Sequence, residues 1–83
     1  MSMTARIIYQ PYHVSGYAGL QPGTPLACRS PEDALRRAER AYKAGLVAGA
    51  DVVRVYHDEE ADEFGDPEFL SRIGQTPDGD EEE

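Results

Sequence analysis

The sequence lacks the cysteine pairs typical of an oxidising compartment and the long apolar runs typical of a membrane protein. It contains one cysteine, Cys28, so no disulfide can form within the chain. Its apolar runs fall well short of the roughly 18 residues that a membrane-spanning helix needs. Residues 1–10 lack the basic segment followed by a long apolar run that marks a signal peptide. We therefore expect a cytoplasmic protein with no membrane span.

The chain also lacks the length for a large core. Its 83 residues predict one small domain, and a domain of that size buries only a modest fraction of its surface. Dimerisation is one way to stabilise such a core. The small residues Ala41, Gly45 and Gly49 would let a helix closely approach either the sheet or a second copy of the chain. A homodimer is therefore an alternative to the monomer.

Basic residues are scarce in the last third of the sequence. Residues 57–83 hold twelve acidic residues and one basic residue, Arg72, whereas residues 1–56 carry a formal charge of +3. The total formal charge is −8. A charge distribution this uneven indicates selection of a charged partner more than it indicates a fold.

The sequence before the helix predicts strands and a turn. Residues 5–14 are rich in Ile, Tyr and Val, which suit a half-buried strand. Pro11 has no N–H to donate, so we expect this strand to lie at a sheet edge or to bulge there. In the stretch rich in Gly and Pro that follows, Pro22 and Gly23 predict the centre of a type II turn. Residues 25–29 predict a short return strand that closes a hairpin.

A helix is the clearest predicted element. Ser30 suits its N-cap and Pro31 its first position, where a missing N–H costs nothing. Gly45 or Gly49 could end it, and we favour Gly49 because the apolar stripe continues to Leu46. The stripe consists of Leu35, Ala38, Tyr42 and Leu46. Opposite charges four residues apart predict three ion pairs: Glu32–Arg36, Asp33–Arg37 and Glu39–Lys43.

Two further strands are predicted after the helix. Residues 50–57 are a dense β-branched run typical of a central strand. Residues 58–66 predict a loop, and residues 68–74 a last strand that pairs with the central one. Residues 75–83 have no apolar side chain and are expected to be a disordered acidic tail. The sequence thus predicts one α+β domain over residues 1–74, with a helix packed on a small antiparallel sheet in the order β-β-α-β-β.

No set of residues predicts catalysis, a cofactor or a metal. Cys28 with His13 or His57 could be drawn as a nucleophile and its base, but no motif supports either pair. Three acids alternate like the start of an EF-hand loop: Asp58, Glu60 and Asp62. The glycine that follows them, Gly65, stands at the eighth position of that loop instead of the sixth. We expect no enzyme activity, no cofactor and no dedicated metal site.

A basic helix face is one candidate binding surface. It is formed by Arg36, Arg37, Arg40 and Lys43. Such a face could contact the phosphates of nucleic acid or an acidic protein. Acidic residues on the same helix and the negative total charge disfavour a polyanion. We therefore favour a solvated face held by internal ion pairs, and we expect no direct binding of nucleic acid.

The acidic region provides the other candidate surface. Residues 58–66 lie between two predicted strands, so their carboxylates can be held at fixed spacing, whereas residues 78–83 form a loose end. Carboxylates ordered on a small scaffold can imitate a phosphate backbone and occupy a basic channel. Two aromatic residues, Tyr56 and Phe64, could anchor such a contact. The predicted acidic contacts are Asp58, Glu59, Glu60, Asp62 and Glu63.

Two resemblances add to this interpretation. The residues at 23–25, Ser30, the stretch ALRRAER at 34–40 and GDPEFLSRIG at 65–74 resemble small uncharacterised proteobacterial and phage proteins of β-β-α-β-β plan. This resemblance would cover residues 5–76, and it implies no activity. In size, acidity and lack of a catalytic set, the chain is similar to phage-encoded inhibitors, including anti-CRISPR proteins. Many of those bind a basic surface of an effector complex, some as DNA mimics. They share no motif with this chain, so they assign no residue.

These observations predict a non-catalytic binding module. In the favoured hypothesis, the acidic loop occupies a basic protein surface, and in its sharpest form the chain is an anti-CRISPR-type inhibitor that blocks target-DNA binding by an effector complex. In the alternative hypothesis, the basic helix face binds nucleic acid or an acidic protein.

Overall fold

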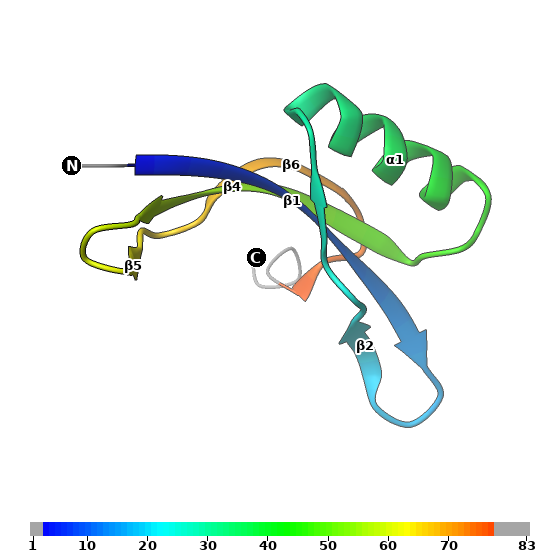
Figure 1. Cartoon of the computed structure of the whole chain (residues 1–83). Helices are drawn as coiled ribbons and strands as arrows, with labels where there is room; N and C mark the ends of the chain where they lie inside the picture. The colour runs from blue at the N-terminus through cyan, green and yellow to red at the C-terminus, as the bar shows by residue number, and fades with distance from the viewer. Residues whose placement is uncertain (1–2, 78–83) are drawn as a thin grey trace.

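The computed structural model describes residues 3–77 and has the expected α+β class. One helix packs on one face of a curled six-stranded antiparallel sheet (Figure 1). The elements in chain order are β1 (Met3–Ser15), β2 (Gly19–Pro22), β3 (Leu26–Cys28), α1 (Pro31–Lys43), β4 (Gly49–Asp58), β5 (Glu63–Phe64) and β6 (Glu68–Gly74). The structure therefore has one more short strand on each side of the helix than the expected order.

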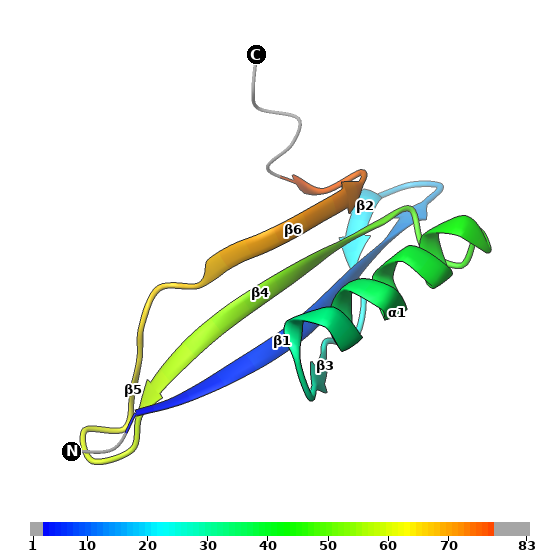
Figure 2. The ribbon, with the colours of Figure 1, turned by 90° about the horizontal axis from the view of Figure 1, so that it is seen from above.

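Strands β1 and β4 form the centre of the sheet. They pair without a register shift from Met3 opposite Asp58 to Tyr12 opposite Gly49. Strands β2 and β3 add to the outer side of β1, while β5 and β6 add to the outer side of β4. Figure 2 shows the long central pair with α1 lying across one half of it. The prediction of a central strand over residues 50–57 and of a last strand paired with it is confirmed.

The expectation that the strand of Pro11 lies at a sheet edge is wrong, because β1 is a central strand, but the alternative of a bulge there fits the structure. Between Tyr12 opposite Pro22 and Tyr9 opposite Leu26, the three residues 23–25 lie across from only two, Gln10 and Pro11. Pro11 faces the gap between β2 and β3, where its lack of an N–H interrupts no regular strand pairing. Gly23 donates its N–H to the Pro11 carbonyl at 2.8 Å, and in a regular antiparallel pair an N–H of residue 11 would return to the Gly23 carbonyl. Instead, the Gln10 side chain donates through Nε2 to that carbonyl at 2.9 Å and to Pro11 O at 2.8 Å. A side-chain amide thus replaces the N–H that proline lacks.

The expected type II turn at Pro22 and Gly23 is also wrong. Gly23 does not have the positive φ that this turn requires, and the chain instead reverses at residues 16–18. The glycine serves close packing: a Cβ on Gly23 would lie 2.7 Å from Nε2 of His13. Turn propensity suggested that Gly23 is needed for a turn, whereas its role in the structure is to leave room for the imidazole of His13.

Helix α1 begins as expected and ends earlier. The Ser30 hydroxyl accepts the N–H of Asp33 at 3.1 Å, which confirms the N-cap. The favoured end at Gly49 is wrong, because the helix ends at Lys43 and Gly45 follows it with φ 76°. Leu46 N–H donates to Ala41 O at 2.9 Å, and Gly45 N–H donates to Tyr42 O at 3.1 Å. These two bonds form the Schellman motif, which satisfies the last carbonyls of a helix.

The predicted stripe is buried only in part: Ala38 is in the core and Leu35 is half-buried, but Tyr42 and Leu46 are exposed. Ala34 and Ala38 are fully buried, whereas Tyr42 is 45% exposed and Leu46 is 69% exposed. Two alanines on the inner face let the helix axis lie close to the sheet, so larger neighbours are left at the margin. The core consists of Ile7, Tyr9, Ala34, Ala38, Ala50 and Val52, with Cys28, Leu70 and Ile73 packed against it.

The described chain continues past β6 in contact with the domain. Gln75 donates its N–H to Ala48 O at 3.0 Å, and Thr76 is buried. The close approach of residue 75 to the start of β4 requires glycine at position 49, because any Cβ there would collide with the Gln75 carbonyl. The rest of the expected acidic tail, residues 78–83, lies outside the described residues. The described helix, α1, is not long and apolar enough to cross a membrane.

Candidate functional site

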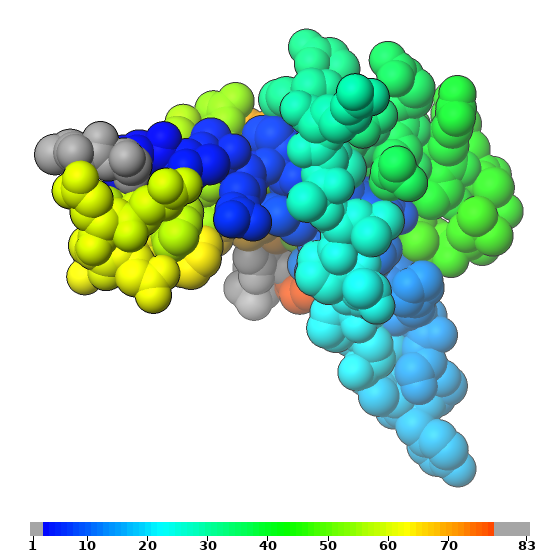
Figure 3. Space-filling view, in the orientation of Figure 1, coloured from blue at the N-terminus to red at the C-terminus, as the bar shows by residue number. Residues whose placement is uncertain are grey.

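The end of β4, the turn after it and β5 form a hairpin that we call the acidic hairpin, residues 57–66. It projects at one end of an elongated molecule measuring 45 × 24 × 23 Å, on the side away from α1 (Figure 3). Strand β5 pairs with β4 through Phe64 opposite His57 and Glu63 opposite Asp58. Part of the expected loop is therefore a strand, and only four residues, 59–62, turn between the two strands.

Asp58 shapes the turn. Its Oδ1 accepts the N–H of Glu60 at 3.1 Å and the N–H of Ala61 at 3.4 Å. This is the local hydrogen bonding by which aspartate nucleates turns. The turn closes at Asp62, which has φ 55°, a left-handed conformation that aspartate tolerates better than most residues. Asp58, one of the predicted contact residues, thus uses one carboxylate oxygen to accept hydrogen bonds from the backbone of the turn.

His57 fixes the other side of the hairpin. Its ring stacks on Phe64 with centroids 4.4 Å apart and planes 17° from parallel. Its Nε2 lies 3.1 Å from Oδ1 of Asp62. The stack and the polar contact tie the turn back to the strands, so the imidazole is a brace of the hairpin.

Two further contacts hold the base of the hairpin. The Thr4 hydroxyl, on β1, donates to Glu59 Oε2 at 2.6 Å. Gly65 donates its N–H to the carbonyl of Tyr56 at 2.9 Å. The hairpin is therefore tied to both central strands, through Thr4 on β1 and through Tyr56 on β4.

The acidic side chains lie at the surface of this braced frame. Asp62 keeps 88% of its side chain exposed in spite of its contact with His57. Residues 57–66 contain no lysine or arginine, so their field is not neutralised within the hairpin. The remaining exposed acids of the hairpin are Glu59, Glu60, Glu63 and Asp66.

The two predicted aromatic anchors do not form one patch. Phe64 pairs with His57, and Tyr56 is the residue before His57 on the same strand. Successive strand side chains point to opposite faces, so the structure places Tyr56 and Phe64 on opposite faces of the sheet. Phe64 is 63% exposed and Tyr56 is 39% exposed. Of the two, Phe64 shares the face of the acidic hairpin where His57 and Asp62 meet.

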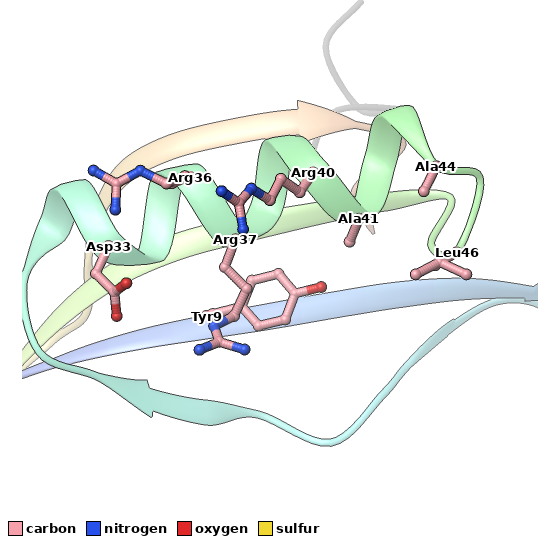
Figure 4. Close-up of a pocket in the computed structure, with 8 residues that line it drawn as sticks. All are labelled: Tyr9, Asp33, Arg36, Arg37, Arg40, Ala41, Ala44 and Leu46. Carbon is pink, nitrogen blue, oxygen red and sulfur yellow. The ribbon is translucent and has the colours of Figure 1, made fainter.

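The basic helix face differs from the predicted one. None of the three expected ion pairs of α1 is formed in residues 3–77. Three guanidinium groups instead line a cavity of about 560 Å³ that we call the arginine groove (Figure 4). Lys43 does not line it. Its lining includes Arg36, Arg37, Arg40, Tyr9, Ala44 and Leu46.

Tyr9 forms the floor of the arginine groove, and the sequence analysis did not single it out. It is 5% exposed, and its hydroxyl has no hydrogen-bond partner among the described residues. Burial raises the pKa of Tyr9 above 10.0, with Arg37 acting to lower it and Cys28 to raise it. The hydroxyl is therefore a protonated donor at neutral pH. Strand alternation was the available signal, because it places Tyr9 with Ile7 on the helix-covered face.

A buried ion pair on the sheet was also missed. The Asp51 side chain is 1% exposed and accepts from Arg72 Nε at 2.9 Å and Nη2 at 3.3 Å. The Tyr12 hydroxyl donates to its Oδ2 at 3.0 Å. Arg72 also lies over the Phe69 ring, 4.1 Å from its centroid. Asp51 within a β-branched run was the signal for it, because a lone acid there needs a buried partner.

The residues considered for catalysis are not brought together. Along β1, Cys28 lies opposite Ile7, while His57 lies opposite Thr4 at the hairpin end. His13 is six residues further along β1 than Ile7, a separation of about 20 Å at the rise of a strand. Within residues 3–77, no group of three or more His, Cys, Asp or Glu side chains is arranged to hold a metal ion.

Comparison with known proteins returned no relative: no family model, curated protein or solved structure matches the chain. The two surfaces described above, the acidic hairpin and the arginine groove, therefore rest on geometry alone.

Proposed function

We propose that the chain is a non-catalytic binding module that places its acidic hairpin against a basic protein surface in the cytoplasm. In its sharpest form, the partner is a nucleic-acid-binding effector complex, and the hairpin occupies the channel for target DNA, as anti-CRISPR-type inhibitors do. Asp62, Glu60 and Glu63 would meet cationic side chains of the partner, with Phe64 as the apolar anchor.

The single observation that carries the proposal is the bracing of the hairpin. Carboxylates on a mobile loop lose conformational freedom when they bind, which reduces their net contribution to affinity. Here the turn is already fixed by Asp58, by the His57–Phe64 stack and by the bond from Thr4 to Glu59. Negative charges presented on a fixed frame give both fast association and selectivity for a matching basic surface.

The test neutralises the hairpin without changing its shape. The variant carries Glu59→Gln, Glu60→Gln, Asp62→Asn and Glu63→Gln, since amides can still accept the bonds from Thr4 and His57. The partner is isolated from the native host with the wild-type chain, and its dissociation constant is then measured against salt. We expect wild-type affinity to fall with salt and the variant to bind at least about tenfold more weakly.

A deletion of residues 78–83 is the matched control, because it removes five acids from the tail and leaves the hairpin intact. We expect it to keep most of the wild-type affinity. Equal affinity of a folded hairpin variant and the wild type would refute the proposal. For the sharpest form, the measurement is target-DNA binding by the effector complex, which the wild-type chain should inhibit and the hairpin variant should not.

A further inference from the structure

The arginine groove concentrates cationic groups in excess over its one carboxylate, that of Asp33. Arg36, Arg37 and Arg40 form no ion pair with any described residue, although Asp33 also lines the groove. Their guanidinium groups together with the Asp33 carboxylate give the groove a formal charge of +2. In a chain of net charge −8, a local excess of positive charge on a concave surface is the electrostatic complement of a small anion.

The hydroxyl of a buried tyrosine points into the same space. Figure 4 shows the Tyr9 ring beneath the helix with its hydroxyl directed along the groove. The residue is 5% exposed, and the hydroxyl has no partner among the described residues. Among the described residues, the buried side-chain polar atom that lacks a partner is Nδ1 of His57, so the Tyr9 hydroxyl is open to the groove and can donate to a ligand oxygen there.

The groove also has an apolar end. Ala44 and Leu46 line it beyond Arg40, after the last turn of α1 (Figure 4). Leu46 is 69% exposed, because the early helix end leaves it without a place in the core. The volume of about 560 Å³ lies in the range of about 300–1,000 Å³ that is usual for small-molecule sites.

We propose that the arginine groove binds a small phosphate monoester that carries an apolar or aromatic group. The phosphate dianion would be held by Arg37 and Arg40 with the Tyr9 hydroxyl as a further donor, and the organic group would lie against Ala44 and Leu46. A phosphate monoester carries a charge of about −1.5 to −2 at neutral pH, which matches the charge of the groove better than a single carboxylate does. Planar guanidinium groups bind phosphate oxygens in pairs, which adds geometric selectivity.

The arrangement favours a compact ligand over a nucleic-acid strand. A strand needs cations spread along an open surface. In this helix Lys43 stands outside the groove, and of the three arginines that line it, Arg37 and Arg40 lie near the ring of Tyr9 (Figure 4). The negative field of the rest of the chain would also repel a polymer over its length, whereas a small ligand meets mainly the local charge.

Phenyl phosphate is the probe that tests the proposal, added to the full-length chain and followed by isothermal titration and by ¹⁵N chemical shifts. We expect saturable binding, with shifts at the amides of α1 and near Tyr9. Inorganic phosphate lacks the apolar group and should bind at least about tenfold more weakly. A short single-stranded DNA is the polymer arm, and tighter binding of the DNA than of phenyl phosphate would overturn the assignment.

Three variants locate the site. Arg37→Gln and Arg40→Gln each remove one charged donor and should weaken phenyl phosphate binding about tenfold or more. Arg29→Gln is the matched control, because Arg29 is exposed and outside the groove, and its affinity should stay within about twofold of wild type. Equal weakening by Arg29→Gln, or no saturable binding to the folded wild type, would overturn the assignment.

Tyr9→Phe distinguishes a ligand donor from a packing residue. The substitution keeps the ring that fills the core and removes only the hydroxyl, so the urea midpoint should change little. Phenyl phosphate affinity should fall by about threefold to tenfold for the loss of one hydrogen bond. An unchanged affinity with a folded Tyr9→Phe variant would remove the hydroxyl from the site. None of these measurements depends on the partner of the acidic hairpin.

Discussion

At the scale of single residues, the least replaceable group is the carboxylate of Asp51. It is almost fully buried and spends both oxygens, on Arg72 and on Tyr12. A buried charge is tolerated only while its partners remain. Asp51 and Arg72 stand directly opposite each other on β4 and β6, so the pair also penalises any slip of β6 by one residue, because Arg72 would then face the other side of the sheet.

Removing the arginine tests this residue-scale role. Arg72→Ala leaves the buried carboxylate without its cation and should lower the free energy of unfolding by about 2–4 kcal/mol. Arg54→Ala is the control, because Arg54 pairs at 3.2 Å with Glu68, whose side chain is 55% exposed. That substitution should cost about 0–1 kcal/mol. Urea unfolding followed by circular dichroism measures both, and similar midpoint shifts would contradict a special role for the buried pair.

At the scale of elements, the end of α1 determines what the arginine groove can contain. The helix stops at Lys43 because Gly45 adopts a left-handed conformation and closes the Schellman motif. The chain then leaves the helix axis at Leu46 and carries this side chain to the rim of the groove. An end at Gly49 would have continued the helix over that rim and kept Leu46 on the predicted stripe.

A glycine replacement tests the helix end. Gly45→Ala forces a Cβ into φ 76° and should lower the free energy of unfolding by about 1 kcal/mol. Gly16→Ala is the control, since Gly16 has no positive φ and a Cβ there meets nothing within 4 Å. It should leave stability unchanged or raise it by a few tenths of a kcal/mol. The measurement is again urea unfolding, and equal effects of the two alanines would argue against the capping role.

The helix and strands were predictable from the sequence where residues close in the chain determine their position. Ser30 and Pro31 fixed where α1 starts, and the β-branched run fixed β4, because capping and propensity act within a few residues. The helix end was not predictable, since Gly45 and Gly49 are equal candidates until tertiary contacts are known. Gly49 is required by the Gln75 backbone, a contact that no local pattern encodes.

The candidate sites were predictable to a similar degree. The acidic hairpin could be located because its residues are contiguous in the chain. Its bracing could not, because Thr4 comes from β1 and because the stack of His57 on Phe64 depends on the register between β4 and β5. The arginine groove depends on Tyr9, which joins the helix residues only through the packing of α1 on β1. Charge pairing rules for an isolated helix predicted ion pairs there, and the folded surface does not form them.

At the scale of the whole molecule, opposite charges occupy opposite ends. The acidic hairpin projects away from α1, and the arginine groove lies along α1 (Figures 1 and 3). The field of one end reaches the other only when salt is low, because the screening length is about 30 Å at 0.01 M and about 8 Å at 0.15 M ionic strength. The two sites should therefore be coupled at low salt and independent at physiological salt.

The neutral hairpin variant tests this coupling. In 0.01 M salt, it should bind phenyl phosphate more tightly than wild type, since a repulsive field has been removed. In 0.15 M salt the two affinities should agree within about twofold. The tail deletion of residues 78–83, with a similar change in total charge, provides the comparison. A difference between hairpin variant and wild type that persists at high salt would show a structural connection between the two ends.

The pairing of β1 with β4 sets when this chain can fold. Strand β1 is made first, yet its longest partner starts at Gly49 and ends at Asp58, after the helix and both short strands have been synthesised. Long-range antiparallel pairing of this kind slows folding, because loop closure precedes the gain from contacts. On the ribosome, the edge of β1 that faces β4 must stay unpaired until Asp58 has emerged, so the central pair of the sheet forms only after β2, β3 and α1 have been made.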